Sequence, residues 1–400
     1  MAAARTVIVA GAGIGGLAAA LALAQRGFKV TLFEAAPRLE EIGAGLQLSP
    51  NAARVLVALG IEERLKPHVV CPEHLAVRSA RSGRLLAQAP LGASVAQRYG
   101  APYWVIHRGD LQAALCEAVA ATPAITLELG TRVEGFAARD GGVAVLASQE
   151  SQSCETQGIA LIAADGLWST LRQRLGHRAA PRAAGQTAWR TLVPAHAAPK
   201  KITENLTAPA VSLWLGHDAH LVHYPVKAGH MINVVAIVDD EWREPGWNTP
   251  GVTRELLDRF AAEHWHASAR DLLATAEHWQ KWALFDCAPL SAWGDGAVTL
   301  LGDAAHPMLP YLAQGAAMAI EDAAVLAECL DRNPDTPAAL RRYEANRLPR
   351  TTRVQRDAHH NGTVYHMRGA AAVLRSLGLM AMGGDRLIGR YDWLYGWTPP

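Results

Sequence analysis

The sequence has few cysteines, and they are not arranged to build a disulfide framework or a structural metal site. Its 400 residues include five, which are scattered and form no CxxC pair: Cys71, Cys116, Cys154, Cys287 and Cys329. We therefore expect free thiols and a reducing, cytoplasmic location. The 16 histidines are not accompanied by an HExxH-type or carboxylate-rich pattern, so no metal is expected.

An excess of charge of either sign is also missing. The chain carries 38 basic and 37 acidic residues, a formal net charge of +1. Neither a nucleic acid nor an anionic membrane is therefore an expected partner. The stretch over residues 6–24 is uncharged and could suggest a membrane span, but it contains four glycines between residues 11 and 16 and continues into a charged segment. We interpret it as part of a folded α/β unit.

Glycine, by contrast, occurs with a spacing that has a chemical meaning. A β-branched run typical of a buried parallel strand, residues 7–9, precedes a GxGxxG loop, and a predicted helix follows to about Arg26. The first glycine permits a tight turn, the second lets the backbone approach a pyrophosphate, and the third lets the helix pack on the sheet. The helix N-terminus would face the phosphates. The residues expected at the ligand are Gly11, Gly13, Ile14, Gly15 and Gly16.

A carboxylate follows where the ribose of a dinucleotide would lie. The predicted second strand, residues 29–33, is followed by Glu34, 18 residues after Gly16, and then by Ala35. A carboxylate here accepts hydrogen bonds from ribose hydroxyls and would repel a 2′-phosphate. The ligand is therefore expected to be FAD or NAD rather than NADP.

A second motif, over residues 302–323, is placed to contact the far end of the same ligand; it reads GDAAHPMLPYLAQGAAMAIEDA. Asp303 follows a predicted buried strand, and its carboxylate could accept hydrogen bonds from ribityl hydroxyls. Gly315 and Ala316 begin a helix whose N–H groups and positive dipole would face a flavin pyrimidine. A helix cap for Asp303 and a loop glycine for Gly315 are the alternatives. Together, the two segments indicate FAD.

The rest of the chain predicts nucleotide-binding segments separated by an inserted sheet. We expect helices over residues 49–65 and from His107, a hairpin over 125–146, a buried strand from Ile159, and strands over 185–240. The fold is thus expected to be α/β, with a Rossmann-like FAD-binding domain and an inserted antiparallel-sheet substrate domain, followed by a helical C-terminal region. The expected ranges are 1–70, 101–180 and 281–330 for the first, 71–100 and 181–280 for the second, and 331–400 for the third.

Four motifs in this order resemble the signatures of the single-component (group A) flavoprotein aromatic hydroxylases. They are GAGIGG at 11–16, HRGDL at 107–111, ADGLWSTLR at 164–172 and the 302–323 segment. Within this family the chain is most similar to salicylate hydroxylase and 3-hydroxybenzoate 6-hydroxylase, over residues 5–395. The resemblance implies a p-hydroxybenzoate hydroxylase-like fold and an FAD-dependent monooxygenase. Such an enzyme hydroxylates a small phenolic or heteroaromatic acid with O₂ and NAD(P)H through a flavin hydroperoxide.

The resemblance also implies roles for two residues of the middle motifs. Arg108 would reach FAD, with a surface arginine as the alternative. Asp165, in a tight turn before Gly166, would order the pyrophosphate end of FAD and could also meet NAD(P)H. Capping of the turn is the alternative for Asp165.

The segment AHLVHYPV, residues 219–226, carries the predicted catalytic pair. Side chains of a strand alternate between its faces, so His220 and Tyr224 share one face and His223 lies on the other. The His-x-x-x-Tyr spacing matches the substrate-side pair of the 3-hydroxybenzoate and 6-hydroxynicotinate hydroxylases. We expect His220 to act as a base or phenolate partner and Tyr224 as a hydrogen-bond donor. A half-exposed structural pair is the alternative.

Two departures from the family limit the assignment of a substrate. Pro310 stands where the 3-hydroxybenzoate enzyme has a glutamine near its substrate, so that recognition of a carboxylate cannot be carried over. Gln47 resembles the 3-hydroxybenzoate enzyme, whereas the nicotinate enzyme has histidines at this position and at that of Tyr311. We expect Pro310 beside the reacting centre, and Gln47 and Tyr311 at the substrate. Arg190 is either a carboxylate anchor or part of a structural ion pair.

A second GxGxxG loop is absent, so NAD(P)H is expected to bind only transiently, and the sequence does not decide between NADH and NADPH. A homodimer is one possible assembly. Two other functions share the FAD motifs: a dehydrogenase or oxidase that inserts no oxygen, and a non-catalytic redox sensor. The first would need no phenol-activating face, and the second is disfavoured because no reactive cysteine pair is present.

Overall fold

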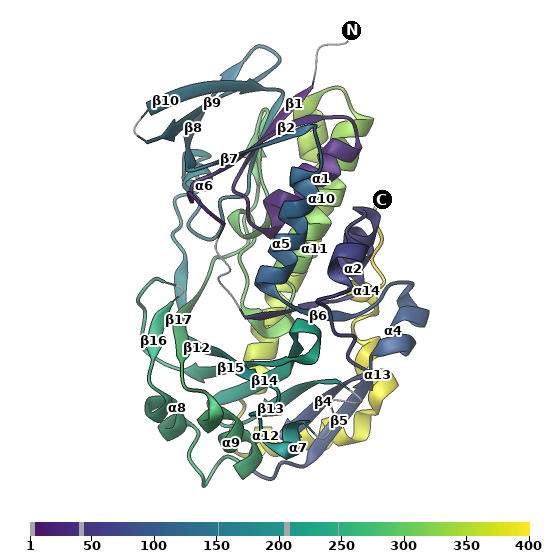
Figure 1. Ribbon diagram of the computed structural model, residues 1–400, viewed down its shortest axis with the longest axis vertical. Helices are drawn as coiled ribbons and strands as arrows, with labels where there is room; N and C mark the ends of the chain where they lie inside the picture. Colours follow the sequence, from purple (N-terminus) through teal and green to yellow (C-terminus); the bar gives the residue numbers. More distant parts are fainter. Residues whose placement is uncertain (1–4, 40–43, 151, 204–208, 247) are drawn as a thin grey trace.

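The computed structural model describes residues 5–39, 44–150, 152–203, 209–246 and 248–400. Two large sheets lie one beyond the other along the long axis, and helices run between them (Figure 1). The first sheet has six strands in the order β18-β19-β11-β1-β2-β7, and only the β18–β19 pair is antiparallel. Its strands are β1 (Thr6–Ala10), β2 (Lys29–Glu34), β7 (Ile125–Leu129), β11 (Ala160–Ala163), β18 (Gly294–Asp295) and β19 (Val298–Leu300).

The first βαβ unit forms as its hydrophobic pattern predicts. Val7, Ile8 and Val9 are fully buried at the centre of the parallel sheet, where apolar runs are favoured because the helix over residues 14–25 packs on the sheet and the strands of residues 131–158 also cover it. Helix α1 (Ile14–Gln25) follows the glycine loop and packs against helix α10 (Gly315–Arg332). This packing brings the two sequence motifs, nearly 300 residues apart, to the same end of the sheet.

A hairpin expected over residues 125–146 is only partly correct. Residues 125–129 form β7 and pair with β2 in the parallel sheet. The hairpin itself consists of β8 (Thr131–Arg139) and β9 (Gly142–Gln149), extended by β10 (Gln152–Gly158) into a separate three-stranded sheet. The change from parallel strand to hairpin occurs at Gly130, whose φ of +68° favours glycine.

The second large sheet has eight strands in the order β16-β17-β12-β15-β14-β13-β4-β5. It is antiparallel except between β13 and β4, which are parallel. Strand β17 continues past residue 280, although we expected the nucleotide-binding segments to resume at residue 281. Its strands are β4 (His74–Ser79), β5 (Leu85–Pro90), β12 (Arg182–Pro194), β13 (Ala210–Leu215), β14 (Ala219–Val226), β15 (Met231–Asp239), β16 (Thr249–Gly251) and β17 (Trp279–Asp286). A short pair, β3 (Gly45–Leu48) and β6 (Trp104–His107), lies beside β14 and α10.

The single helix expected over residues 49–65 is divided in two. Gly60 has a φ of +76°, a left-handed conformation that ends α2 (Pro50–Ala58) before α3 (Glu62–Leu65) begins. The other short helices are α4 (Gly92–Tyr99), α5 (Arg108–Ala120), α6 (Thr170–Arg174), α7 (Lys200–Thr203), α8 (Thr253–Arg259) and α9 (Ala267–Thr275), with 3₁₀ turns at Lys227–Gly229, Gly302–Ala304 and Pro310–Leu312.

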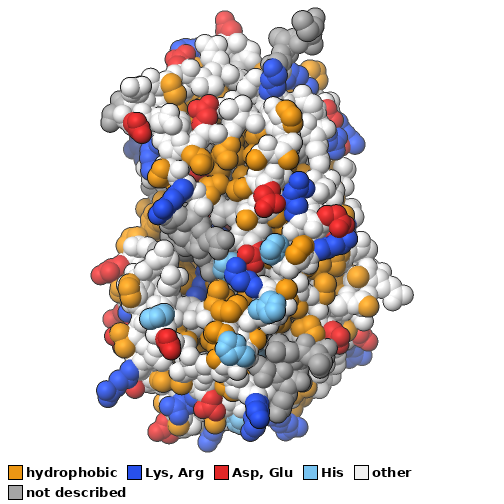
Figure 2. Space-filling view, viewed as in Figure 1, with side chains coloured by type: hydrophobic (Ala, Val, Ile, Leu, Met, Phe, Trp, Pro, Cys, Tyr) orange, Lys and Arg blue, Asp and Glu red, His pale blue; other side chains and the backbone are white. Residues whose placement is uncertain are grey.

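The C-terminal region connects the two large sheets. Helix α11 (Thr336–Tyr365) contacts β18 and β19 of the parallel sheet, and its C-terminal end reaches the eight-stranded sheet (Figure 1). Helices α12 (Gly369–Met382), α13 (Gly384–Gly389) and α14 (Asp392–Tyr395) follow, and the first two pack on β5. Within the described ranges, no helix combines the length and apolar character needed to cross a bilayer. Acidic and basic side chains are interspersed on the face shown in Figure 2.

Candidate functional site

A long cleft runs from the glycine loop to the inner face of the eight-stranded sheet. It consists of two cavities with empty volumes of about 780 and 1520 Å³, counting space open to solvent. Gly13, Ala164 and Gly166 line both cavities, which makes them one continuous cleft. Its two ends are chemically different, as the two halves of an extended dinucleotide require.

The glycines of the loop serve three different purposes. Gly11 has a φ of +108°, and a Cβ there would lie 2.4 Å from the Ala164 carbonyl oxygen. A Cβ on Gly16 would lie 1.8 Å from the Gly11 carbonyl oxygen, so Gly16 is needed for the turn itself. A Cβ on Gly15 would collide with Leu301 where α1 packs on α10. Gly13 differs, because a Cβ there would meet nothing within 4 Å and would point into open space.

The smaller cavity has the donors and acceptors of a ribose and pyrophosphate site. Glu34 and Ala35 both line it. The Glu34 carboxylate accepts hydrogen bonds from the backbone N–H groups of Ala12 (2.7 Å) and Ala36 (2.8 Å), which fix its position and leave lone pairs for ligand hydroxyls. Asp165 accepts from the backbone N–H of Leu171 through Oδ2, and its buried Oδ1 has no partner within the described residues. Asp165 therefore both caps a turn and offers a free acceptor to the cleft.

The larger cavity begins at the second motif. Asp303, in the 3₁₀ turn after β19, and Arg108, at the start of α5, line it together with Ile14 and Gly15. Burial raises the pKa of Asp303, while His306 and Arg108 oppose that rise. Gly315 and Ala316 line the cavity at the N-terminus of α10, where the first backbone N–H groups have no acceptor within the helix. These groups suit the hydroxyls and the electron-rich ring of a flavin.

A buried network that the sequence did not reveal holds α10 in this position. Gln314, which precedes α10, donates to the Ser49 hydroxyl (2.8 Å) and accepts from Asn51 (3.1 Å). Asp322 accepts from the backbone N–H of Gly302 (3.0 Å) and bonds to His306 (2.6 Å), which links both ends of the 302–323 motif. The sequence signal for this network was the pair of adjacent carboxylates, Glu321 and Asp322, in an otherwise apolar helix, because buried charges need partners.

Two arginines of α11 neutralise these carboxylates. Arg347 contacts Glu321 at 2.5 Å and Asp322 at 2.7 Å, and all three side chains are almost fully buried. Arg350 donates to both oxygens of Glu321 at 2.7 Å. The charges of Glu321 and Asp322 raise the pKa of Arg347 although burial alone would lower it. Helix α11 thus holds α10, whose first residues line the cavity, by buried ion pairs.

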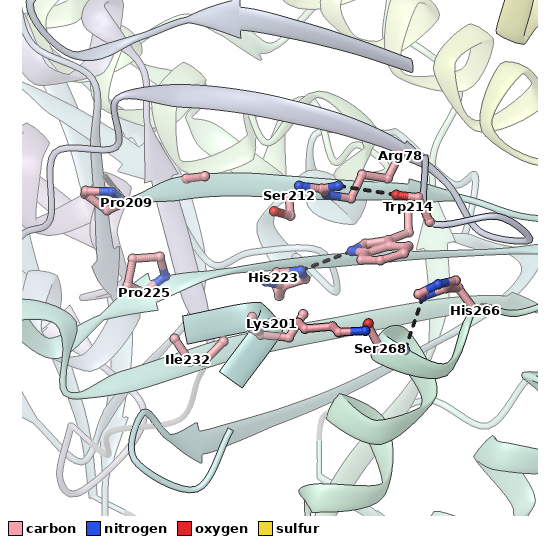
Figure 3. A pocket seen from close by; sticks show the side chains of 13 residues that line it. Arg78, Lys201, Pro209, Ser212, Trp214, His223, Pro225, Ile232, His266 and Ser268 are labelled. Atoms are coloured by element: carbon pink, nitrogen blue, oxygen red, sulfur yellow. Dashed lines mark hydrogen bonds between the residues drawn. The ribbon is translucent and has the colours of Figure 1, made fainter. Parts of the chain in front are cut away.

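The eight-stranded sheet forms the far wall of the cleft. His220, Val222 and Tyr224 of β14 line the cavity, as strand alternation requires. His223 lies on the opposite face, where its Nε2 accepts from the Trp214 indole N–H at 3.0 Å (Figure 3). Burial, with the nearby charge of Arg78, lowers the pKa of His223 to about 3, so it stays neutral and structural.

His220 and Tyr224 are buried among other aromatic side chains. Burial and the neighbouring His366 hold the pKa of His220 well below its ordinary value, so the imidazole is neutral and has one ring nitrogen without a proton. Burial likewise raises the pKa of Tyr224 and keeps its hydroxyl protonated as a donor. Gln47 lines the same cavity and accepts from the Tyr103 hydroxyl at 2.7 Å.

Arg190 lines the cavity without a carboxylate partner. No ion pair to it occurs within the described residues, and its buried Nε has no hydrogen-bond acceptor there. The guanidinium instead stacks on the Trp282 ring, 3.5 Å from the centroid. Burial and the charge of Arg108 lower the pKa of Arg190 to about 9, which still leaves a cation at neutral pH. The structural ion pair, one of the two alternatives for Arg190, is thus not found within the described residues.

Two further predicted residues differ in their placement. Pro310 begins a 3₁₀ turn and lines the cavity near Arg190. Tyr311 does not line it: its ring packs behind His220 at 5.4 Å between centroids, and its hydroxyl donates to Gln186. A direct substrate contact is therefore not supported for Tyr311. The turn at Pro310 directs adjacent side chains to different sides.

The described residues contain no cluster of three or more His, Cys, Asp or Glu suited to a metal.

Comparisons with known proteins identify the family of the chain. The family described as FAD binding domain matches residues 4–358. The 3-hydroxybenzoate 6-hydroxylase 1 of Aquipseudomonas alcaligenes is 39% identical over 394 residues, covering 98% of this chain and 97% of that protein. A salicylate hydroxylase substrate complex has 29% identity and a TM-score of 0.82, covering 99% and 96% of the two chains. Klebsiella pneumoniae HpxO with FAD and uric acid has 27% identity and a TM-score of 0.86, covering 98% and 96%. The chain therefore belongs to the FAD-binding-domain family and, within it, to the FAD-dependent aromatic monooxygenases.

Proposed function

We propose that this enzyme hydroxylates a small phenolic carboxylic acid of the 3-hydroxybenzoate or salicylate type, with O₂ and NADH or NADPH as co-substrates. The observation that carries the substrate class is one cavity wall with two kinds of polar group. Neutral His220 and protonated Tyr224 suit a phenol oxygen, and the unpaired cation of Arg190 suits a carboxylate. Between them, Val222, Val235 and Ile237 supply an apolar surface for the ring.

Each side chain has a distinct task in this proposal. FAD, which Gly13, Glu34 and Asp303 would help to hold, would supply the chemistry that activates O₂. The protein makes the ring electron-rich: Nε2 of His220 accepts the phenol proton, and the Tyr224 hydroxyl donates to the resulting oxygen. The apolar walls and Pro310 exclude water from the reacting carbon. NAD(P)H, for which the chain has no second glycine loop, binds transiently to reduce the flavin.

A substrate screen tests the proposal. Purified protein with FAD is mixed with NADH or NADPH and with hydroxybenzoates, hydroxynicotinates or anthranilates, and hydroxylated product is counted against H₂O₂. We expect at least one hydroxybenzoate to give mainly product. NAD(P)H oxidation that yields only H₂O₂ with every aromatic acid would contradict the proposal and favour an oxidase.

Replacement of Arg190 by methionine tests the carboxylate anchor. A hydrogen bond to a charged group contributes about 1.5–3 kcal/mol, so we expect KM for 3-hydroxybenzoate to rise about 10- to 100-fold, with a smaller change in kcat. A phenol without a carboxylate should be affected little. Arg190→Lys retains the charge but not the planar fork, and it should fall between the two. Equal changes in KM for both kinds of substrate would rule out the anchor.

A further inference from the structure

Three side chains form a continuous hydrogen-bonded path from the cleft to the protein surface. Nδ1 of His220 lies 2.9 Å from Nε2 of His366, and Nδ1 of His366 lies 2.6 Å from Oδ1 of Asp239. Exposure increases outward along this path: His220 is 2% exposed, while the side chains of His366 and Asp239 are 6% and 37% exposed. The path therefore begins at the buried catalytic histidine and ends in contact with water.

Each member comes from a different element, so the path depends on the tertiary fold. His220 is on β14, Asp239 ends β15, and His366 directly follows α11. The rings of Tyr311 and Tyr365 pack against His220, with centroids 5.4 and 5.3 Å away. These rings enclose the inner end of the path and leave His366 as the polar neighbour of His220 Nδ1.

The outer carboxylate sets the direction of every hydrogen bond. Burial would raise the pKa of Asp239, but the hydrogen bond and charge of His366, with Gln186 and Arg368, hold that pKa below its usual value. An ionised Asp239 only accepts, so Nδ1 of His366 carries a proton and donates. Neutral His366 then accepts at Nε2 from the Nδ1–H of His220. His220 is left with a lone pair on Nε2, the atom available to the cleft.

We propose that His366 and Asp239 are relay residues that carry the substrate's phenol proton from His220 to solvent. The phenol O–H bond breaks and its proton binds Nε2 of His220, while the Nδ1 proton of His220 passes to Nε2 of His366. The His366 imidazolium, paired with Asp239, then releases its Nδ1 proton through that carboxylate to water. One proton leaves and one phenolate remains. His220 ends with an Nε2–H that donates to the phenolate oxygen.

The electrostatics of the site explain why a relay is needed. Burial holds the pKa of His220 well below its ordinary value, which disfavours a positive charge on this ring. A positive charge arriving on His366 would lie beside the Asp239 carboxylate, whose Oδ1 is 2.6 Å from Nδ1 of His366. The positive charge is therefore better accommodated one ring further out, where Asp239 balances it. This inference rests on the proposed function, since it concerns the proton of a phenolic substrate.

Stopped-flow mixing of FAD-loaded enzyme with 3-hydroxybenzoate tests the relay. The phenolate absorbance reports deprotonation, and a pH-indicator dye in weakly buffered solution reports proton release. In His366→Gln, which keeps a hydrogen-bonding side chain but cannot relay a proton, we expect both rates to fall on the order of 10²-fold. Asp239→Asn should slow both less. FAD affinity and the rate of flavin reduction should stay unchanged.

The controls separate the relay from a structural role and from the proposed function. His223→Gln, a buried histidine on the opposite face of the same strand, should deprotonate the substrate at the wild-type rate. Wild-type rates in both His366→Gln and Asp239→Asn would overturn the relay while leaving the proposed function intact. If His366→Gln does not fold, Asp239→Asn, at the half-exposed end, decides alone. Failure of the wild-type enzyme to bind or hydroxylate any hydroxybenzoate would overturn the proposed function, and the relay with it.

Discussion

His220→Ala is expected to bind FAD and to be reduced normally, yet to hydroxylate its substrate on the order of 10²-fold more slowly, the usual contribution of a general base. Without an acceptor for the phenol proton, the ring is not electron-rich enough to take up oxygen, and H₂O₂ should become the main product. Product and H₂O₂ measured per NAD(P)H oxidised give the result directly.

Two variants on the same strand sharpen this prediction. Tyr224→Phe removes one donor and should weaken substrate binding by about 1 kcal/mol, the net value of a single hydrogen bond. His223→Ala changes the opposite face, next to Trp214, and should hydroxylate at close to the wild-type rate. If His223→Ala uncoupled the enzyme and His220→Ala did not, the catalytic role would belong to the other face.

Gly13→Val is expected to give a folded, colourless protein. Gly13 has φ and ψ of −69° and 179°, a conformation that valine adopts readily, and a Cβ added there would meet no protein atom within 4 Å. The branched side chain would instead occupy the space where the loop approaches the pyrophosphate. We expect FAD affinity to be lost, as measured by flavin absorbance after reconstitution and gel filtration.

A matched glycine elsewhere provides the control. Gly378 in α12 also has open space around an added Cβ, so Gly378→Val should remain yellow and bind one FAD per chain. Unchanged circular dichroism would show that Gly13→Val still folds. Full flavin occupancy in Gly13→Val would place the pyrophosphate elsewhere.

Local patterns made much of the site predictable. Backbone geometry within a few residues determines the spacing of Gly11, Gly13 and Gly16 and the alternation of side chains along β14. The structure places these residues as the spacing and the alternation predict. The helix over residues 49–65 was predicted wrongly as one piece because its hydrophobic pattern continues through Gly60, whose left-handed conformation interrupts it.

Contacts between distant residues were not predictable in this way. His366 lies 146 residues from His220, and nothing in the local sequence of either indicates the other. Tyr311 was expected at the substrate from its correspondence to a histidine of the nicotinate enzyme, but it lies in a 3₁₀ turn and its ring packs against His220. The stacking of Arg190 on Trp282 likewise depends on how β12 and β17 pair, which the sequence pattern does not specify.

The buried cluster of Glu321, Asp322, Arg347 and Arg350 also constrains how this sequence can change. Loss of Arg347 alone would leave two carboxylates in the interior with too little compensating charge, at a cost of about 3–5 kcal/mol, a large part of a domain's total stability. Exchanging the acids and the arginines together for apolar residues of similar volume could be nearly neutral, but every single-step route to that exchange passes through an unbalanced interior charge. The cluster therefore couples substitutions in α10, which lines the cleft, to substitutions in α11, which ends next to His366.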